Sequence, residues 1–427
     1  MSLKDQNSGD PRFFRRLSLL KNLKYLNLDL QKINHSLNLE TLQRFLQITH
    51  KRQSWPKFQI LRLSLYYPVP LRSNIDQTLW TLSQSLRNLG QIITLMPTKL
   101  ELDVPLKIDC NIETAAHFSE ALKSVSQLTR LELSGKSYNF FTSVLGELNQ
   151  YQNLQELFLY FFLGDQPEAE GKLIQILQKS MKECKSLRRL EMSLWFRDHS
   201  NKAPTDTQFQ PDGILINLSN SLSSLRTLEH LTLNISLPTN EKIQAGTSKM
   251  LSCINSLRSL KILELDLSRF GDNITDEELN TLCASLRNFE NLYHLSMNFS
   301  SQQIKDLGIK SLEQTLPLLK NLGYFALSLN NCEGISSFAV AKLISKLNQL
   351  KYLSFLTLCL KELRIDTIFT QALMKTIPQL KFLTFFRLIN TGTQKSKKVL
   401  DDLKEWIQLF KTRMIGDIQE SYFDLML

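Results

Sequence analysis

Few residues in this sequence have the types and spacing that catalysis requires. Gly135-Lys136-Ser137 follows an expected strand and precedes an expected helix, as a phosphate-binding loop would. Such a loop also needs a glycine five residues before its Gly-Lys pair, and Arg130 occupies that position. The sequence contains no GxSxG, HExxH, GxGxxG, HRD or DFG pattern. We therefore expect an ordinary turn at Gly135, no catalytic residues and no cofactor.

The histidines and cysteines predict no metal centre. His230 and His294 fall at equivalent positions of two strands that should have one other strand between them, roughly 10 Å apart. A single ion needs histidine nitrogens at about 2.1 Å. Cys332 and Cys359 follow consecutive strands, where buried thiols are the favoured interpretation and a redox pair is the alternative. Six cysteines without a CxxC pair indicate reduced thiols, and hence a cytoplasmic protein, with the nucleus as the alternative.

These residues lie on a pattern of short strands and helices that recurs along the chain. Leu128-x-x-Leu131-x-Leu133 is one copy, and its alternating apolar residues are typical of a strand. Between copies the apolar residues recur with helical spacing, as they do within 279–286. Thr275 and Glu278 form a capping box at the start of that helix. The copies begin near residues 23, 58, 97, 128, 154, 187, 228, 260, 292, 322, 350 and 380, a mean period of about 32 residues.

The repeated LxxLxL resembles the leucine-rich repeat family, in the longer strand-plus-helix form of the ribonuclease-inhibitor-like proteins. The resemblance covers about residues 23–390. It implies an α/β solenoid shaped like a horseshoe, with a parallel β-sheet on the concave face and helices on the convex face. At the ninth position of the repeat, where the family usually has Asn or Cys, Asn330 is the clear match. The other residues there are Gln31, Lys136, Phe162, Trp195, Ser236, Ser268 and Ser300, so the family's ladder of buried asparagines should be mostly missing.

The pattern divides the chain into three parts. Residues 1–22 should form an N-terminal tail and capping helix, and residues 23–390 one elongated array of about 12 repeats. Residues 391–427 should form a C-terminal capping helix and tail. Because the terminal repeats of such an array need polar caps, we place the two capping helices over 11–21 and 396–412.

Strand side chains between the core leucines should line the concave face, because alternate residues of a strand point to opposite faces. The acidic residues predicted there are Asp29, Glu101, Asp103, Glu132, Glu156, Glu191, Glu264 and Asp266. The basic residues predicted there are Arg62, Lys99, Arg130 and Arg189. The face would then be acidic on a chain whose formal net charge is +10. It would favour a partner with a basic segment, unless arginines on neighbouring strands neutralise the acids.

Aromatic residues collect at the C-terminal end of the predicted concave face. Tyr324, Tyr352 and Phe382 fall at one strand position in three consecutive repeats, with Phe386 beside them. Exposed aromatic clusters anchor protein interfaces, and the alternative is that the C-terminal capping helix covers this one. The predicted partner-binding residues are Glu101, Glu132, Glu191, Glu264, Asp266, Tyr324, Tyr352, Phe382 and Phe386.

These features together predict a non-enzymatic scaffold that binds a protein partner through the concave face. No signal peptide, membrane span or small-molecule substrate is expected. Basic residues also gather near both ends of the chain, at Arg12, Arg15, Arg16, Lys21 and Lys24 and at Lys395, Lys397 and Lys398. With a pI of about 9.2, a nucleic-acid-associated subunit that uses these terminal segments is an alternative. A regulatory adaptor of an enzyme is a third interpretation.

Overall fold

The structure is a computed structural model of the 427-residue chain. The residues that it describes are 2–3, 24–29, 60–64, 76, 79–80, 83–84, 86–87, 99–106, 110–125, 127–163, 167–196, 211–237, 243–271, 273–390, 405–406 and 422–426. The chain divides into two compact units, residues 1–191 and 192–427, which are described separately below.

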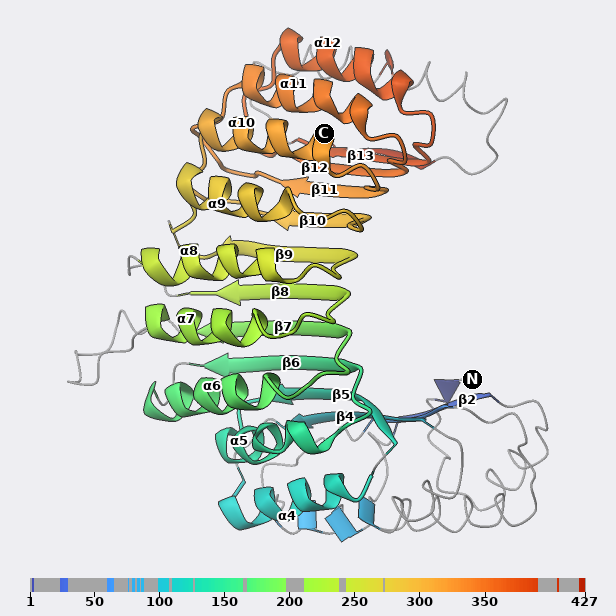
Figure 1. The fold of residues 1–427 in the computed structure, drawn as a ribbon. Coiled ribbons are helices and arrows are strands. Elements are labelled where there is room, and N and C mark those ends of the chain that lie inside the picture. The colour runs from blue at the N-terminus through green and yellow to red at the C-terminus, as the bar shows by residue number, and fades with distance from the viewer. Residues whose placement is uncertain are drawn as a thin grey trace. The chain divides into compact units, whose positions relative to one another are not determined.

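In the first unit, each strand from β1 to β6 pairs in parallel with the next, and helices alternate with the strands from β4 onward (Figure 1). The strands are β1 (Ser2–Leu3), β2 (Tyr25–Asp29), β3 (Ile60–Ser64), β4 (Lys99–Leu106), β5 (Leu128–Gly135) and β6 (Glu156–Leu163). The helices with described bounds are α4 (Ile112–Lys123), α5 (Tyr138–Gly146), α6 (Pro167–Met181) and the 3-10 turn η1 (Leu148–Gln150). Strand β7 (Arg189–Phe196) begins in this unit and crosses its boundary.

The second unit repeats the same order, and each strand from β8 to β14 again pairs in parallel with the next. The strands are β8 (His230–Ser236), β9 (Ile262–Arg269), β10 (His294–Asn298), β11 (Tyr324–Ser328), β12 (Phe355–Cys359), β13 (Phe385–Ile389) and β14 (Tyr422–Met426). The helices are α7 (Pro211–Leu222), α8 (Gln244–Cys253), α9 (Asp276–Leu286), α10 (Asp306–Thr315), α11 (Ser337–Lys346) and α12 (Thr367–Thr376). Most helices end in a 3-10 turn: η2 (Ile254–Ser256), η3 (Leu316–Leu318), η4 (Leu347–Gln349) and η5 (Ile377–Gln379).

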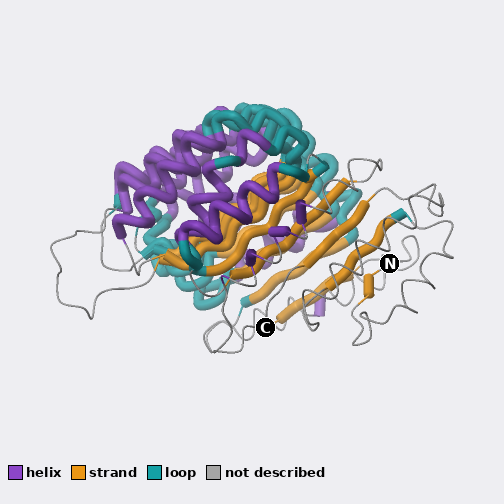
Figure 2. Tube along the Cα trace, turned by 90° about the horizontal axis from the view of Figure 1, so that it is seen from below, coloured by secondary structure: helices purple, strands orange, loops and turns teal. Residues whose placement is uncertain are grey.

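Within each unit the helices lie on one side of the strands (Figure 2), and we call the other side the open face. The leucines of the repeat point toward the helices. In β9, Leu263 and Leu265 are buried, whereas Glu264 between them is partly exposed. Burying each such leucine contributes about 1.5–3 kcal/mol, and the contribution recurs in every repeat. The predicted α/β fold of parallel strands alternating with helices, as in leucine-rich repeat proteins, is confirmed.

The predicted register is wrong in two strands of the second unit. The sequence holds two overlapping copies of the pattern there, because leucines occur three residues apart at 350, 353 and 356. Strand β12 begins at Phe355, which is the Cα partner of Tyr324, so the true copy starts three residues later than predicted. Strand β13 is shifted in the same way, with Phe385 opposite Phe355. The correct copy buries Leu356 and Leu358 of β12, whereas the predicted copy would have buried Phe355.

The loops of the second unit are held by polar side chains that reach across to the next repeat. Oδ1 of Asp276 accepts hydrogen bonds from the backbone N–H groups of Lys305 at 2.7 Å and Gly308 at 2.9 Å. Oδ1 of Asn330 accepts one from the N–H of Lys361 at 2.8 Å. These side chains give backbone N–H groups outside the regular structure a hydrogen-bond partner in the neighbouring repeat.

Several predictions about the ends of the chain fall on residues that the structure does not describe. The helix expected over 11–21 lies outside the described residues, and of the helix expected over 396–412 only Glu405 and Trp406, both helical, are described. The three-part division of the chain stays a prediction. Strands β1 and β14 were not predicted from the repeat. In the described part of the chain, no helix combines the length and the apolar character needed to cross a bilayer.

One glycine is required by the close approach of neighbouring repeats. Gly246 is the third residue of α8, and its N–H donates to Oδ1 of Asp212 at 2.8 Å. A Cβ at Gly246 would lie 2.8 Å from the backbone oxygen of Asp212 and 2.9 Å from Cβ of Leu215. Gly213 is the third residue of α7, and a Cβ there would meet no atom within 4 Å.

We expect Gly246→Ala to lower the free energy of unfolding by about 1–3 kcal/mol, because α8 must move away from α7. The matched variant Gly213→Ala should be neutral or should stabilise by up to about 1 kcal/mol, because alanine favours helix without a clash. Urea unfolding followed by circular dichroism measures both. Equal effects of the two substitutions would contradict the close approach.

Candidate partner-binding surface on the strands

An arginine–phenylalanine sandwich lies on the open face of the first unit. The guanidinium carbon of Arg130 lies 3.7 Å from the ring centroid of Phe158, and that of Arg189 lies 5.0 Å from it. Phe158 is only 3% exposed, so the two cations cover most of its ring. Cation–π contacts of this kind contribute roughly 0.5–2 kcal/mol each. The ring holds both arginines in place on the strand surface.

The acids of this face are paired with those arginines. Arg130 forms ion pairs with Glu132 at 2.9 Å and Glu156 at 3.0 Å, and Arg189 approaches Glu191 at 3.4 Å. The pKa of Arg130 lies above its ordinary value, because its bonds to the two carboxylates outweigh its burial. Glu132 and Glu191 therefore fit the alternative interpretation, in which arginines on the strands pair with the acidic residues.

Tyr160 completes this network. Its hydroxyl donates to Oε1 of Glu191 at 2.7 Å. Burial and the Glu191 carboxylate raise the pKa of Tyr160 above its ordinary value, so the phenol stays protonated. Glu101 lies at a strand position of β4 opposite Arg62 and Arg130, and its side chain is outside the described residues.

The predicted acids of the second unit are also engaged by neighbouring side chains. Glu264 accepts a hydrogen bond from the Thr232 hydroxyl at 3.0 Å, and its Oε1 lies 3.1 Å from Nε2 of His294. The contact with His294, with help from Thr232, holds the pKa of Glu264 below its ordinary value despite partial burial. Asp266 accepts hydrogen bonds from the backbone N–H and the hydroxyl of Ser268, at 3.1 and 2.7 Å. These acids therefore keep their charge but are held by local contacts on the open face.

Four aromatic rings form a continuous stack across the open face of the second unit. His294 and Tyr324 stack with ring centroids 3.9 Å apart and planes 6° from parallel. Phe355 follows at 5.7 Å from Tyr324, and Phe385 at 5.3 Å from Phe355. The stack arises because β10 to β13 pair in register, which places one ring of each strand beside the next. We call these four residues the aromatic ladder.

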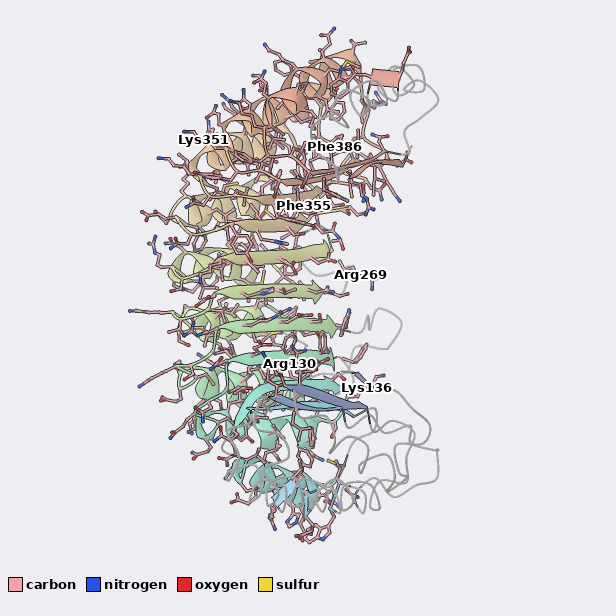
Figure 3. All side chains as sticks on the ribbon, turned by 90° about the vertical axis from the view of Figure 1, so that its right-hand side faces the viewer. Arg130, Lys136, Arg269, Lys351, Phe355 and Phe386 are labelled. Carbon is pink, nitrogen blue, oxygen red and sulfur yellow. The ribbon has the colours of Figure 1, made fainter. Side chains whose placement is uncertain are left out.

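The aromatic ladder differs from the predicted aromatic cluster. Tyr324 lies where it was predicted. Phe386 was assigned to the partner-binding face, but it is 0% exposed and belongs to the core, because the register of β13 is shifted. Tyr352 and Phe382 are exposed, but they lie on turns before β12 and β13 and pair with each other at 6.2 Å. Figure 3 labels Phe355 and Phe386, which come from neighbouring strands and belong to opposite faces.

Two members of the ladder, Phe355 and Phe385, were not predicted from the sequence to face outward. One signal in the sequence could have identified them. Leucines at positions 358 and 388 fit the core pattern only if each copy starts three residues later than predicted. The same holds for Arg387, whose guanidinium carbon lies 5.5 Å from the Phe385 ring centroid.

Small side chains lie beside the ladder. Ser296, Ala326 and Thr357 are Cα partners on successive strands, and each follows a ladder residue by two positions. Because they are short, they leave the ladder standing above its neighbours on the strand surface. The row leads to Arg387 on β13 and, in the other direction, to Glu264 on β9. The face therefore offers an apolar strip with an acid at one end and a base at the other.

The remaining candidates for chemistry are involved in local contacts. The Ser137 hydroxyl accepts hydrogen bonds from the N–H groups of Phe140 and Cys110, as expected for the turn predicted there. Burial raises the pKa values of Cys332 and Cys359, which lowers the fraction of reactive thiolate. Among the described residues, no group of three or more His, Cys, Asp or Glu could hold a metal ion.

Glu264 should make stability depend on pH in the acidic range. Its lowered pKa means that the folded state holds the carboxylate more strongly than the unfolded chain does, so this stabilisation is present above the unfolded pKa. It is lost as the pH falls through the folded value. We expect Glu264→Gln to destabilise at pH 6, by less than about 1 kcal/mol since the site is half-exposed, and the deficit to shrink below about pH 4.5. Urea midpoints of both proteins at pH 6 and pH 3.5 measure this, and a deficit that does not change with pH would refute it.

No protein-family model matches the sequence, and no curated protein matches it. Among solved structures, the chain is similar to one described as the crystal structure of the Rad7 and Elc1 complex in yeast, with 20% sequence identity and a TM-score of 0.48. The alignment covers 90% of this chain and 81% of that chain. A likeness at this level says nothing about the activity or the partners of this protein.

Proposed function

We propose that this chain is a non-enzymatic leucine-rich repeat scaffold that binds a protein partner through the open face of its second unit. The observation that carries the proposal is the aromatic ladder of His294, Tyr324, Phe355 and Phe385. The long strand-plus-helix repeat supports the ribonuclease-inhibitor-like form of the family. Catalytic residues and a cofactor form no part of this function.

The ladder has the properties of an interface anchor. Phe355 is 40% exposed, although a large apolar ring is usually buried in a folded protein. Aromatic side chains at the centre of a protein interface contribute most of its binding free energy. Stacking and strand pairing already hold the rings in place, so the rings lose little conformational entropy when a partner binds.

Charges at the two ends of the ladder indicate the polarity of the partner. Glu264 lies opposite Ser296 on the neighbouring strand, with its Oε1 3.1 Å from Nε2 of His294, and Arg387 lies beside Phe385. We infer that an extended segment crosses β9 to β13 with apolar side chains against the rings. A basic residue would face Glu264, and an acidic residue would face Arg387. From the sequence we expected a partner with a basic segment. We now propose a partner segment that carries charges of both signs.

The six cysteines support a reducing compartment. All are thiols, and five are buried within the repeats. Burial raises the pKa of Cys253 to about 12 and that of Cys283 to about 12, which keeps both thiols protonated and unreactive. We propose the cytoplasm as the location of the protein, with the nucleus as the alternative.

Affinity purification from the native cell, with quantitative mass spectrometry, tests the proposed function. The variant Tyr324→Ser/Phe355→Ser removes the middle of the ladder, and Tyr352→Ser/Phe382→Ser removes two exposed rings outside it. We expect the ladder variant to lower recovery of a protein partner at least about tenfold, because buried aromatic anchors contribute 2 kcal/mol or more. The matched variant should recover the partner as wild type does.

Each variant is first checked for folding by circular dichroism and thermal unfolding. Arg387→Glu serves as a second open-face variant, since it changes the charge at the end of the strip without removing a ring. Recovery of the same partners by wild type, the ladder variant and Arg387→Glu would show that the open face is not the binding surface.

A further inference from the structure

A row of basic residues lies along the turns that precede the strands of the second unit. Each of its members lies two residues before the first leucine of its repeat, and each is exposed. We call this set the basic row: Arg226, Arg258, Lys320, Lys351 and Lys381. In one repeat, the equivalent residue is Glu290. The row lies apart from the aromatic ladder, as the labelled residues Lys351 and Phe355 show in Figure 3.

The same backbone turn presents each cation: in all five repeats, the residue before the cation and the leucine two residues after it each donate an N–H to the carbonyl three residues back. The N–H of Arg226 donates to the carbonyl of Ser224 at 3.0 Å, and the N–H of Arg258 donates to the carbonyl of Ser256 at 3.1 Å. The N–H of Lys320 donates to the carbonyl of Leu318 at 3.0 Å. Because the strands that follow are parallel and in register, successive turns lie side by side at one edge of the sheet. A linear ligand could therefore contact one cation per repeat.

The charges of the row are available to a ligand. Among the described residues, the nearby acids Glu229 and Glu313 pair with other lysines, Lys261 at 2.6 Å and Lys346 at 3.9 Å. In the same part of the chain, no ion pair within 4.0 Å involves a member of the basic row. The row therefore has a strong positive field, interrupted once at Glu290.

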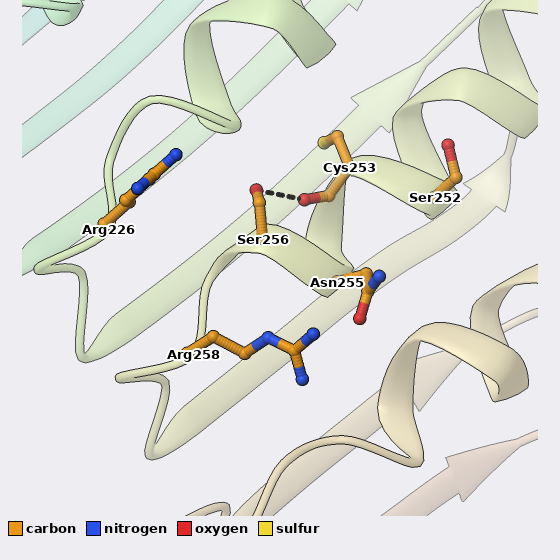
Figure 4. A pocket seen from close by; sticks show the side chains of 6 residues that line it. All are labelled: Arg226, Ser252, Cys253, Asn255, Ser256 and Arg258. Carbon is orange, nitrogen blue, oxygen red and sulfur yellow. Dashed lines mark hydrogen bonds between the residues drawn. The ribbon is translucent and has the colours of Figure 1, made fainter.

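Two members of the row line a cavity of about 450 Å³. Figure 4 shows Arg226 and Arg258 on successive turns, beside the end of α8. Ser252 and Ser256 also line the cavity, and their hydroxyls donate to backbone carbonyls of Lys249 and Cys253. The guanidinium groups are thus the main charged donors there. A guanidinium group suits a phosphate, because its planar donors match two phosphate oxygens.

Aromatic rings accompany the row at its C-terminal end. Tyr352 directly follows Lys351, and Phe382 directly follows Lys381; their side chains are 56% and 57% exposed. The two ring centroids are 6.2 Å apart. Exposed rings beside regularly spaced cations are the combination that binds single-stranded nucleic acids, in which bases stack on the rings and cations contact the backbone.

We propose that the basic row binds single-stranded nucleic acid. Phosphates contact the five cations in order along the turns, beginning in the cavity between Arg226 and Arg258. Bases stack on Tyr352 and Phe382. A duplex fits less well, because its bases are already stacked on one another and cannot reach these rings. An acidic peptide would use the cations, but it would gain little from the exposed rings.

This surface differs from the one assigned to a protein partner. It also differs from the basic terminal segments noted in the sequence, most of which lie outside the described residues. Its test is therefore independent of the test of the aromatic ladder.

The test is fluorescence anisotropy of the full chain with a labelled 15-nucleotide oligouridylate, measured at several salt concentrations. A labelled polyglutamate of 15 residues and a duplex RNA of 15 base pairs are the comparison ligands. We expect the oligouridylate to bind most tightly. The logarithm of its binding constant should fall with the logarithm of salt concentration with a slope of about −3 to −4, as five phosphate contacts require.

Three variants locate the site. Lys320→Gln/Lys351→Gln/Lys381→Gln should weaken oligouridylate binding at least about tenfold and reduce the slope by about 2. The matched variant Lys249→Gln/Lys310→Gln/Lys375→Gln removes equal charge from exposed helix positions and should change neither. Tyr352→Ser/Phe382→Ser should weaken oligouridylate binding at least about fivefold without changing the slope, because stacking is independent of salt. The ladder variant Tyr324→Ser/Phe355→Ser should bind oligouridylate as wild type does.

The proposal is overturned by any of three results. In the first, polyglutamate binds as tightly as oligouridylate, and Tyr352→Ser/Phe382→Ser does not change oligouridylate binding. That result would assign the row to an acidic peptide. The helix-lysine control could weaken binding as much as the row variant, which would show attraction by net charge alone. Oligouridylate binding could be weaker than about 100 μM at 150 mM salt, the affinity of non-specific contact.

Discussion

Every surface feature of this protein depends on the burial of leucines between successive repeats. A single strand-and-helix unit cannot bury its apolar side alone, so each unit is stable only against its neighbours. That packing forces neighbouring strands into register, because a shift of one residue would turn the leucines toward water. Registered strands then place equivalent side chains in rows. The aromatic ladder and the basic row are both consequences of this one constraint, on the strands and on the turns before them.

The sequence was sufficient to predict the strand–helix repeat, because LxxLxL recurs often enough that chance cannot explain it. It was insufficient to choose between two overlapping copies in the repeats of β12 and β13. The error of three residues moved Phe386 to the surface and Phe355 to the core, the reverse of what the structure shows. A partner-binding surface depends on which alternate residue faces out, so a small register error changes its composition. Tyr352 and Phe382 were predicted to be exposed aromatics of the strand face; they are exposed, but they lie on the turns before β12 and β13.

The charge of the open face could not be predicted from residue counts. Glu132 and Glu191 are partnered by arginines that Phe158 holds in place, and Glu264 is held by His294 and Thr232. Such contacts depend on which strands are adjacent and on how side chains fold over one another. Such ion pairs add little stability, but they fix the positions of the charged side chains on the face. The ladder adds an apolar strip, which favours recognition by shape and ring contact.

Site-specific photo-crosslinking in the native cell shows whether a protein binds the open face, because it reports what contacts that face without altering the ladder. A photoreactive amino acid would replace Thr357, beside Phe355 in the ladder, and in a parallel strain Ser311 on helix α10. We expect one dominant protein to be crosslinked at position 357 and to be absent at position 311. Equal crosslinking at both positions, or crosslinks at position 357 to nucleic acid alone, would contradict the assignment of the open face to a protein partner.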